Sequence, residues 1–367
     1  MDFLHQVAPV LTGTEAAALK EYLDSGGWLT EFRQTQLFET MLAEYVGVGH
    51  CTVVTSGTVA LYCALLAAGV GPGDTVLVPN YTMIATPNAV AWTGATPALV
   101  DVEPDTLCLD LGAVAPDVKA AAMLYVPING RCGDMDAVVR FCRERGMVLI
   151  EDACQALGSN WRGRRLGSFG QAGAYSFTPH KIITTGQGGA VATDDDAFAA
   201  RLAKVKDFHR TAPATDEHDG LGFNFKFTDL QAVVGIEQLK DIAARVERKK
   251  AIYGWFREML DPVAAVEMLP TNLEDTAPWF VDVLLPSARD RDALRGHLKA
   301  RGIGSRPFYP PVNHQPMYAA AHGAGSLPVS EGLAVRGLWL PSSLDLTREQ
   351  AGRVCLAIEE FFTGGGR

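Results

Sequence analysis

Short apolar stretches alternate with helical stretches along the first half of the chain, and this alternation restricts the fold more than any other feature. The apolar stretches are residues 51–54, 75–79, 96–102, 120–126 and 147–153. Short, continuously apolar strands that alternate with helices are typical of a mostly parallel sheet covered by helices on both faces. Residues 173–177 and 188–195 read as two further strands in direct succession, which predicts a mixed sheet.

The second half of the chain has a different pattern. Residues 228–260 read as one long helical region that is interrupted at Gly235. A strand at 281–285, a following helix, a proline-rich stretch and a last helix come after it, as in a smaller α/β domain. We therefore predict a large domain of residues 1–240 and a small domain of residues 241–367.

Composition excludes several classes of protein. The 367 residues are 48% hydrophobic and 20% charged, as expected of a folded chain, and a net charge of −10 gives no basic footprint for nucleic acid. The seven cysteines include no CxxC pair, so neither a zinc site nor a disulfide framework is expected. The first residues, MDFLHQVAPVLTG, show no signal peptide or membrane helix, which predicts a cytoplasmic protein with no membrane partner.

Polar residues follow two of the expected strands, where open α/β sheets bind their ligands. Ser56-Gly57-Thr58 lies between a strand and a helix, and its backbone N–H groups and hydroxyls could bind a phosphate or could form an ordinary helix N-cap. Glu151-Asp152 closes an apolar strand, so one of the two acids is expected to point into a site. A helix cap or a metal ligand is the alternative for this pair.

Lys181 lies in a turn-rich segment, residues 176–191, between two apolar strands. A lone lysine is nearly always a solvated surface residue. Here His180 precedes it, several hydroxyl side chains flank it and a glycine-rich backbone follows, so its pKa can be lowered enough for a nucleophile and base. No G-x-G-x-x-G follows the first strand, which argues against a nicotinamide-dependent oxidoreductase.

Several motifs occur in an order that identifies a family. They are SGTVAL, PNYTMIATPNAV, EDACQALGS, HKIITTGQGG and GFNFKFTDLQA. In this order the chain resembles the DegT/DnrJ/EryC1/StrS sugar aminotransferases over almost its whole length, and KIITTG and SRPFYPP are most similar to the GDP-perosamine synthases within that family. The resemblance implies the α/β fold of fold-type I pyridoxal phosphate (PLP) enzymes, with a mostly parallel, mixed seven-stranded sheet and a smaller C-terminal α/β domain.

The resemblance also assigns cofactor roles. Lys181 matches the Schiff-base lysine and Asp152 the carboxylate beside the pyridinium nitrogen, where a negative charge keeps that nitrogen protonated. The remaining matches are Gln155 at the ring oxygen, Met83 against the ring face, Gly57, Thr58 and Ser176 at the phosphate, and Asn224 at the phosphate of the neighbouring subunit. Tyr81 is the alternative to Met83 at the ring.

The implied reaction moves an amino group from L-glutamate to a nucleotide-linked 4-keto-6-deoxy sugar, with GDP-4-keto-6-deoxymannose and GDP-perosamine as the expected acceptor and product. A homodimer with shared active sites is implied, and a tetramer is compatible with it. Substrate contacts are expected from Trp28, Thr30, Tyr81, His180, Arg306, Tyr309 and His314.

The chain departs from the usual family pattern at Pro127, Asn129, Gln187 and Lys226, and these departures leave the sugar open. The alternatives are a UDP- or dTDP-linked 3- or 4-keto sugar, a keto-cyclitol, or a non-catalytic PLP-fold binding protein.

Overall fold

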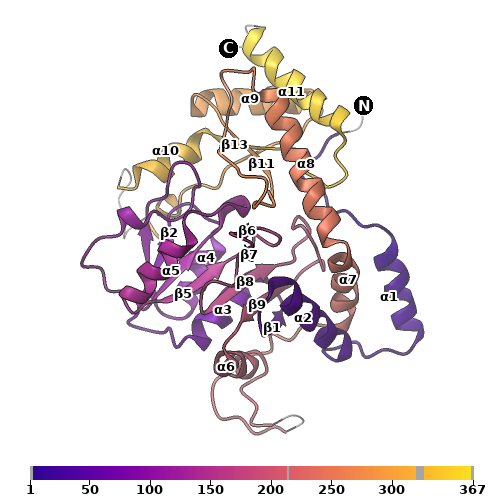
Figure 1. Ribbon diagram of the computed structural model, residues 1–367, viewed down its shortest axis with the longest axis vertical. Helices are drawn as coiled ribbons and strands as arrows, with labels where there is room; N and C mark the ends of the chain where they lie inside the picture. The colour runs from indigo at the N-terminus through magenta and orange to yellow at the C-terminus, as the bar shows by residue number, and fades with distance from the viewer. Residues whose placement is uncertain (1–2, 213–214, 320–325, 365–367) are drawn as a thin grey trace.

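A seven-stranded sheet forms the centre of the larger part of the molecule in the computed structural model, which describes residues 3–212, 215–319 and 326–364 (Figure 1). The strands are ordered β1-β9-β8-β5-β4-β2-β3; β9 runs antiparallel to β1 and β8, and the other pairs are parallel. Their bounds are β1 (His50–Val54), β2 (Thr75–Pro79), β3 (Thr96–Val100), β4 (Ala122–Tyr125), β5 (Val148–Asp152), β8 (Ala172–Ser176) and β9 (Gly189–Thr193). The mostly parallel, mixed sheet that the sequence predicts is confirmed.

Helices cover both faces of this sheet (Figure 1). One apolar core contains α3 (Gly57–Ala67), α4 (Ala85–Trp92) and α6 (Asp196–Lys206), and the other contains α2 (Arg33–Val46), α5 (Met135–Glu144) and α7 (Asp229–Lys240), with α1 (Thr14–Asp24) packed on α7. Neighbouring strand residues alternate between the two cores, as Leu149 and Ile150 do. Both faces of each strand are thus buried, which is why the strands read as continuous apolar runs.

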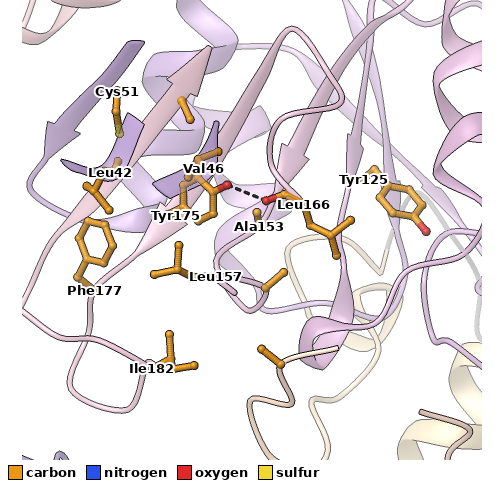
Figure 2. Close-up of a cluster of buried hydrophobic side chains, with 14 of the residues drawn as sticks. Leu42, Val46, Cys51, Tyr125, Ala153, Leu157, Leu166, Tyr175, Phe177 and Ile182 are labelled. Atoms are coloured by element: carbon orange, nitrogen blue, oxygen red, sulfur yellow. Dashed lines mark hydrogen bonds between the residues drawn. The ribbon is translucent and has the colours of Figure 1, made fainter. Parts of the chain in front are cut away.

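The parallel strands fix where a site can form. Since β1, β5 and β8 point the same way, their carboxyl ends meet at one edge of the sheet. Beside this edge lies a buried cluster in which the Tyr175 hydroxyl donates to the carbonyl oxygen of Leu166 at 2.7 Å (Figure 2). The same cluster holds Phe177 and Ile182, two residues of the loop that carries Lys181.

A second, antiparallel sheet has the order β10-β11-β13-β12. Its strands are β10 (Glu267–Met268), β11 (Val281–Leu284), β12 (Arg306–Pro307) and β13 (Gly337–Leu340), and the helices that accompany it are α8 (Ile242–Leu260), α9 (Ala288–Ala300), α10 (Pro328–Arg336) and α11 (Arg348–Thr363). A small hairpin of β6 (Asn160–Trp161) and β7 (Arg164–Arg165) and three short 3₁₀ turns at Leu111–Ala113, Ile128–Gly130 and Val312–His314 complete the fold. None of the helices that the described residues form is long and apolar enough to cross a membrane.

The long helical region breaks at Asp241, between α7 and α8, so the predicted interruption at Gly235 is wrong. Gly235 lies inside α7, where a Cβ atom would stand 2.6 Å from Cζ of Phe38 in α2. This glycine therefore serves the close packing of two helices. The domain boundary between residues 240 and 241 stays a prediction; Leu4, near the start of the chain, pairs with Ile303 of the second half.

Candidate active site

A cavity of about 250 Å³ opens at the carboxyl edge of the large sheet, where the second sheet faces it. Ten of the residues predicted to contact the cofactor or the substrate line it: Gly57, Thr58, Met83, Asp152, Gln155, Ser176, His180, Lys181, Arg306 and Tyr309. They come from segments spread over some 250 positions, so the fold gathers them at one place.

Lys181 occupies the loop between β8 and β9, and its backbone N–H donates to the carbonyl oxygen of Thr178 at 3.0 Å. The Trp279 ring covers the side chain, with Nζ 3.6 Å from the ring centroid. Burial lowers the pKa of Lys181 from 10.5 to about 8, although Cys154 and Asp152 nearby oppose this shift. A substantial share of the amine is therefore neutral near physiological pH, as a nucleophile or base requires.

Asp152 and Glu151 point to opposite sides of β5, because successive strand side chains alternate. Asp152 lines the cavity, and its Oδ2 accepts a hydrogen bond of 2.7 Å from the Thr86 hydroxyl. Glu151 is fully buried and accepts the backbone N–H groups of Gly167 and Phe169, each at 2.6 Å. Asp152 is thus the acid of the pair that faces a ligand, and Glu151 anchors a loop.

The turn before α3 is both a helix N-cap and part of the cavity, the two roles that the sequence left open. Ser56 is the N-cap, since its Oγ accepts the N–H of Val59 at 3.2 Å. Gly57 and Thr58 begin the helix and line the cavity, where first-turn N–H groups and the helix dipole favour an anion. A Cβ on Gly57 would lie 2.7 Å from Cβ of Ser176, so only glycine lets this turn approach the end of β8.

Part of the cavity wall comes from the second half of the chain. Arg306 and Tyr309 line the cavity, and the guanidinium carbon of Arg306 lies 5.6 Å from the Tyr309 ring centroid. Burial, followed by the charges of Lys181 and Arg306, lowers the pKa of His180. The guanidinium of Arg306 thus gives this wall a positive charge that suits an anionic substrate.

The other predicted residues lie outside this cavity. Tyr81 is fully buried and packs against Phe308 and Tyr309, behind the cavity wall. His314 makes a hydrogen bond with Glu331, with Nε2 to Oε2 at 3.1 Å. Trp28, Thr30 and Asn224 are exposed at the protein surface.

Sequence reasoning missed Trp279 and Cys154, which also line the cavity. Trp279 lies just before β11, and its indole N–H donates to the carbonyl oxygen of His180 at 2.7 Å. An aromatic pair directly before an apolar run was the one available signal, and it does not distinguish a core residue from a site residue.

The residues present fit pyridoxal phosphate. The cavity combines an amine of lowered pKa on Lys181, a carboxylate on Asp152 and a helix N-terminus at Gly57. These are the groups that a carbonyl, a protonated ring nitrogen and a phosphate require.

The chain also matches known proteins over almost its whole length. The DegT/DnrJ/EryC1/StrS aminotransferase family matches residues 9–359. The chain is 34% identical to GDP-perosamine synthase of Escherichia coli O157:H7 (99% of this chain, 100% of the relative) and 37% identical to dTDP-3-amino-3,4,6-trideoxy-alpha-D-glucose transaminase of Streptomyces venezuelae (94% and 91%). The crystal structure of the aminotransferase TlmJ from Streptoalloteichus hindustanus superposes with a TM-score of 0.92 at 30% identity, covering 98% of this chain and 99% of TlmJ.

Proposed function

The chain belongs to the DegT/DnrJ/EryC1/StrS aminotransferase family, and we propose that it transfers the amino group of L-glutamate to GDP-4-keto-6-deoxymannose, giving GDP-perosamine. It is a PLP-dependent nucleotide-sugar aminotransferase. The observation that carries the GDP-sugar as acceptor is the end-to-end likeness to GDP-perosamine synthases.

Each residue of the cavity has a task in this proposal. When bound, pyridoxal phosphate supplies an electron sink for amino-group chemistry. Lys181 holds the cofactor and then moves a proton at Nζ, for which a pKa of about 8 is well placed. Asp152, oriented by the Thr86 hydroxyl, keeps a negative charge beside the ring nitrogen. Trp279 and Tyr309 exclude water from the side of the cavity that the second sheet forms.

A panel of nucleotide keto sugars tests the acceptor. With L-glutamate as donor, we expect kcat/KM for GDP-4-keto-6-deoxymannose to exceed that for dTDP- and UDP-linked 4-keto-6-deoxy sugars by about 10²-fold or more, since a site built to bind one base leaves polar groups unpaired with another. Product formation is followed by mass spectrometry. The identity to the dTDP-3-amino-sugar transaminase makes a dTDP-linked 3-keto sugar the second candidate, and a preference for it would replace the first.

We also propose that two copies of the chain share their active sites. The segments before α2 and before α7 are joined, because the N–H of Asp229 donates to the carbonyl oxygen of Thr30 at 3.3 Å. Together they expose Trp28, Leu29 and Leu221, which are 64%, 55% and 82% exposed. Trp28 and Leu29 are adjacent in the chain, and exposed large apolar side chains favour an interface that a second copy would cover. Asn224 lies in the same region, outside the cavity of its own chain.

Mixing two inactive variants tests the sharing. Lys181→Ala and Asn224→Ala each impair the site to which the replaced residue belongs. If Asn224 serves the partner's cavity, a mixed dimer has one site with both residues intact, and random mixing should restore about a quarter of wild-type turnover. If Asn224 serves its own chain, mixing restores nothing beyond the average of the two variants. The variants are mixed under mild denaturant and returned to buffer before the assay, with each variant treated alone as the control.

A further inference from the structure

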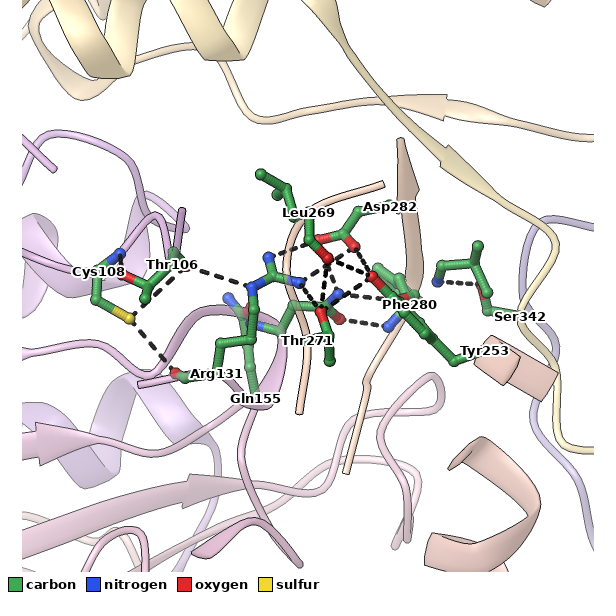
Figure 3. A network of polar contacts seen from close by, with 12 residues as sticks. Thr106, Cys108, Arg131, Gln155, Tyr253, Leu269, Thr271, Phe280, Asp282 and Ser342 are labelled. Carbon is green, nitrogen blue, oxygen red and sulfur yellow. Dashed lines mark hydrogen bonds and ion pairs between the residues drawn. The ribbon is translucent and has the colours of Figure 1, made fainter. Parts of the chain in front are cut away.

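A buried polar network joins the loop after β4 to strand β11 of the second sheet (Figure 3). Arg131 donates to Asp282 through Nη2 to Oδ2 at 2.6 Å and Nη1 to Oδ1 at 3.1 Å, and the two side chains are only 3% and 1% exposed. In Figure 3, Gln155, which lines the cavity, is drawn at the Arg131 end of the network, and Asp282 is at the other end. Such a two-pronged buried pair fixes the position of both partners.

Asn129 occupies the centre of this network. Its Nδ2 donates to Oδ2 of Asp282 at 2.9 Å and to the carbonyl oxygen of Phe280 at 2.8 Å, while its Oδ1 accepts the N–H of Phe280. The residue is buried and has φ 54° and ψ 27°, a left-handed conformation that asparagine tolerates better than most residues. The side chain of Asn129 is thus fully engaged with Phe280 and with Asp282 of β11, and this holds its backbone in place.

The backbone of Asn129 faces the cavity residues. Its N–H donates to Oε1 of Gln155 at 2.9 Å, and its carbonyl oxygen accepts the N–H of Trp279 at 3.4 Å. Because an N–H can be met only by the oxygen of the Gln155 amide, this bond decides which way the amide lies and leaves its NH₂ as the donor for a ligand. Trp279 is the residue whose ring covers Lys181.

We propose that Asn129 is a positioning residue of the cofactor site: it orients the Gln155 amide so that the NH₂ donates to the bound cofactor, and it holds Trp279 over Lys181. The inference rests on the proposed cofactor contact of Gln155 and is independent of which sugar is the acceptor. One residue thereby ties both walls of the cavity to β11. A change of one ångström in such supporting residues is enough to lower activity.

Asn129→Gly tests the inference, because glycine keeps the left-handed backbone and its N–H while removing all three side-chain hydrogen bonds. We expect the dissociation constant of pyridoxal phosphate to rise about tenfold, as for the loss of one well-oriented hydrogen bond. We also expect the pH midpoint of the bound cofactor's visible absorbance to shift and kcat to fall more than KM rises. Titration of the apoprotein and a spectral pH titration of the holoenzyme measure these effects.

Asn80→Gly is the matched control. Asn80 is equally buried, and its amide also makes three hydrogen bonds to the second half of the chain: Nδ2 to Oδ1 of Asn313 at 3.0 Å, Nδ2 to Oγ of Ser330 at 2.7 Å, and Oδ1 from the N–H of Asn313 at 2.9 Å. It should lower the melting temperature as Asn129→Gly does, with the absorbance midpoint unchanged. Equal midpoints in the two variants would overturn the inference.

Gln155→Ala separates this inference from the assignment on which it rests. If Gln155→Ala leaves cofactor affinity and the absorbance midpoint at wild-type values, the cofactor contact of Gln155 is wrong and the positioning role falls with it. If Gln155→Ala changes both and Asn129→Gly changes neither, the contact stands and the positioning role is wrong. Should Asn129→Gly not fold, Asn129→Ala takes its place, since it also removes the Nδ2 donors to Phe280 and Asp282 and the Oδ1 acceptor without adding a charge.

Discussion

Replacement of Lys181 by alanine is expected to lower turnover by about 10⁴-fold or more, the scale seen when a covalent catalytic group is removed. Lys181 is the one side chain of the cavity, as the structure describes it, that offers an amine, and its pKa is lowered to about 8 by burial under Trp279. Without Lys181, the cofactor has no covalent bond to the protein, and no other amine of the described cavity can take over the proton transfer. The visible absorbance of the linked cofactor should disappear together with the activity.

Lys249→Met is the control for this variant. Lys249 is also buried, its pKa is lowered to about 7 by burial, and its Nζ donates to the carbonyl oxygens of Trp279 and Ser342. It does not line the cavity, so its replacement should leave the absorbance of the linked cofactor in place.

A small primary amine added to Lys181→Ala should raise the residual rate if the lost group moved a proton. Lys181→Ala with wild-type turnover would refute the whole cofactor assignment.

The residues at the edge of the large sheet could be predicted from the sequence because the strands that carry them are visible in it. Gly57, Asp152 and Ser176 follow or end apolar runs, and parallel strands bring their carboxyl ends together. Only the structure shows which acid of the Glu151-Asp152 pair faces the cavity. Strand alternation puts the two side chains on opposite sides, and the hydrogen bonds of Glu151 to the 167–170 loop show which side is which.

The residues contributed by the second sheet could not be predicted in the same way. Trp279 reaches Lys181 only through the packing of two sheets against each other, and its sequence neighbours resemble those of an ordinary core strand. Tyr81 illustrates the opposite failure: it follows β2 at the correct edge of the sheet, but its ring turns into the core behind Tyr309. Asn129 stood out as a departure from the family pattern, and only the hydrogen bonds to β11 give it a role.

The neighbouring acids of β5 allow the role of Asp152 to be separated from simple support of the fold. Asp152→Asn keeps the shape of the side chain and its contact with the Thr86 hydroxyl but removes the charge. A protonated ring nitrogen then has no carboxylate beside it, and we expect kcat to fall by about 10²- to 10³-fold, the scale of losing one preorganised electrostatic partner in an active site. The absorbance of the bound cofactor should shift, and the melting temperature should change little.

Glu151→Gln should give the opposite result. Glu151 accepts three backbone N–H groups from residues 167–170, so an amide there leaves buried donors unmet and should lower the free energy of unfolding by about 1–3 kcal/mol. Its carboxylate is turned away from the cavity, and the cofactor absorbance should stay at its wild-type position. Thermal melts and spectra of the two holoenzymes measure this contrast directly. If Asp152→Asn and Glu151→Gln shifted the cofactor spectrum alike, the spectrum would not depend on which carboxylate faces the cavity, and the assignment of Asp152 to the ring nitrogen would be wrong.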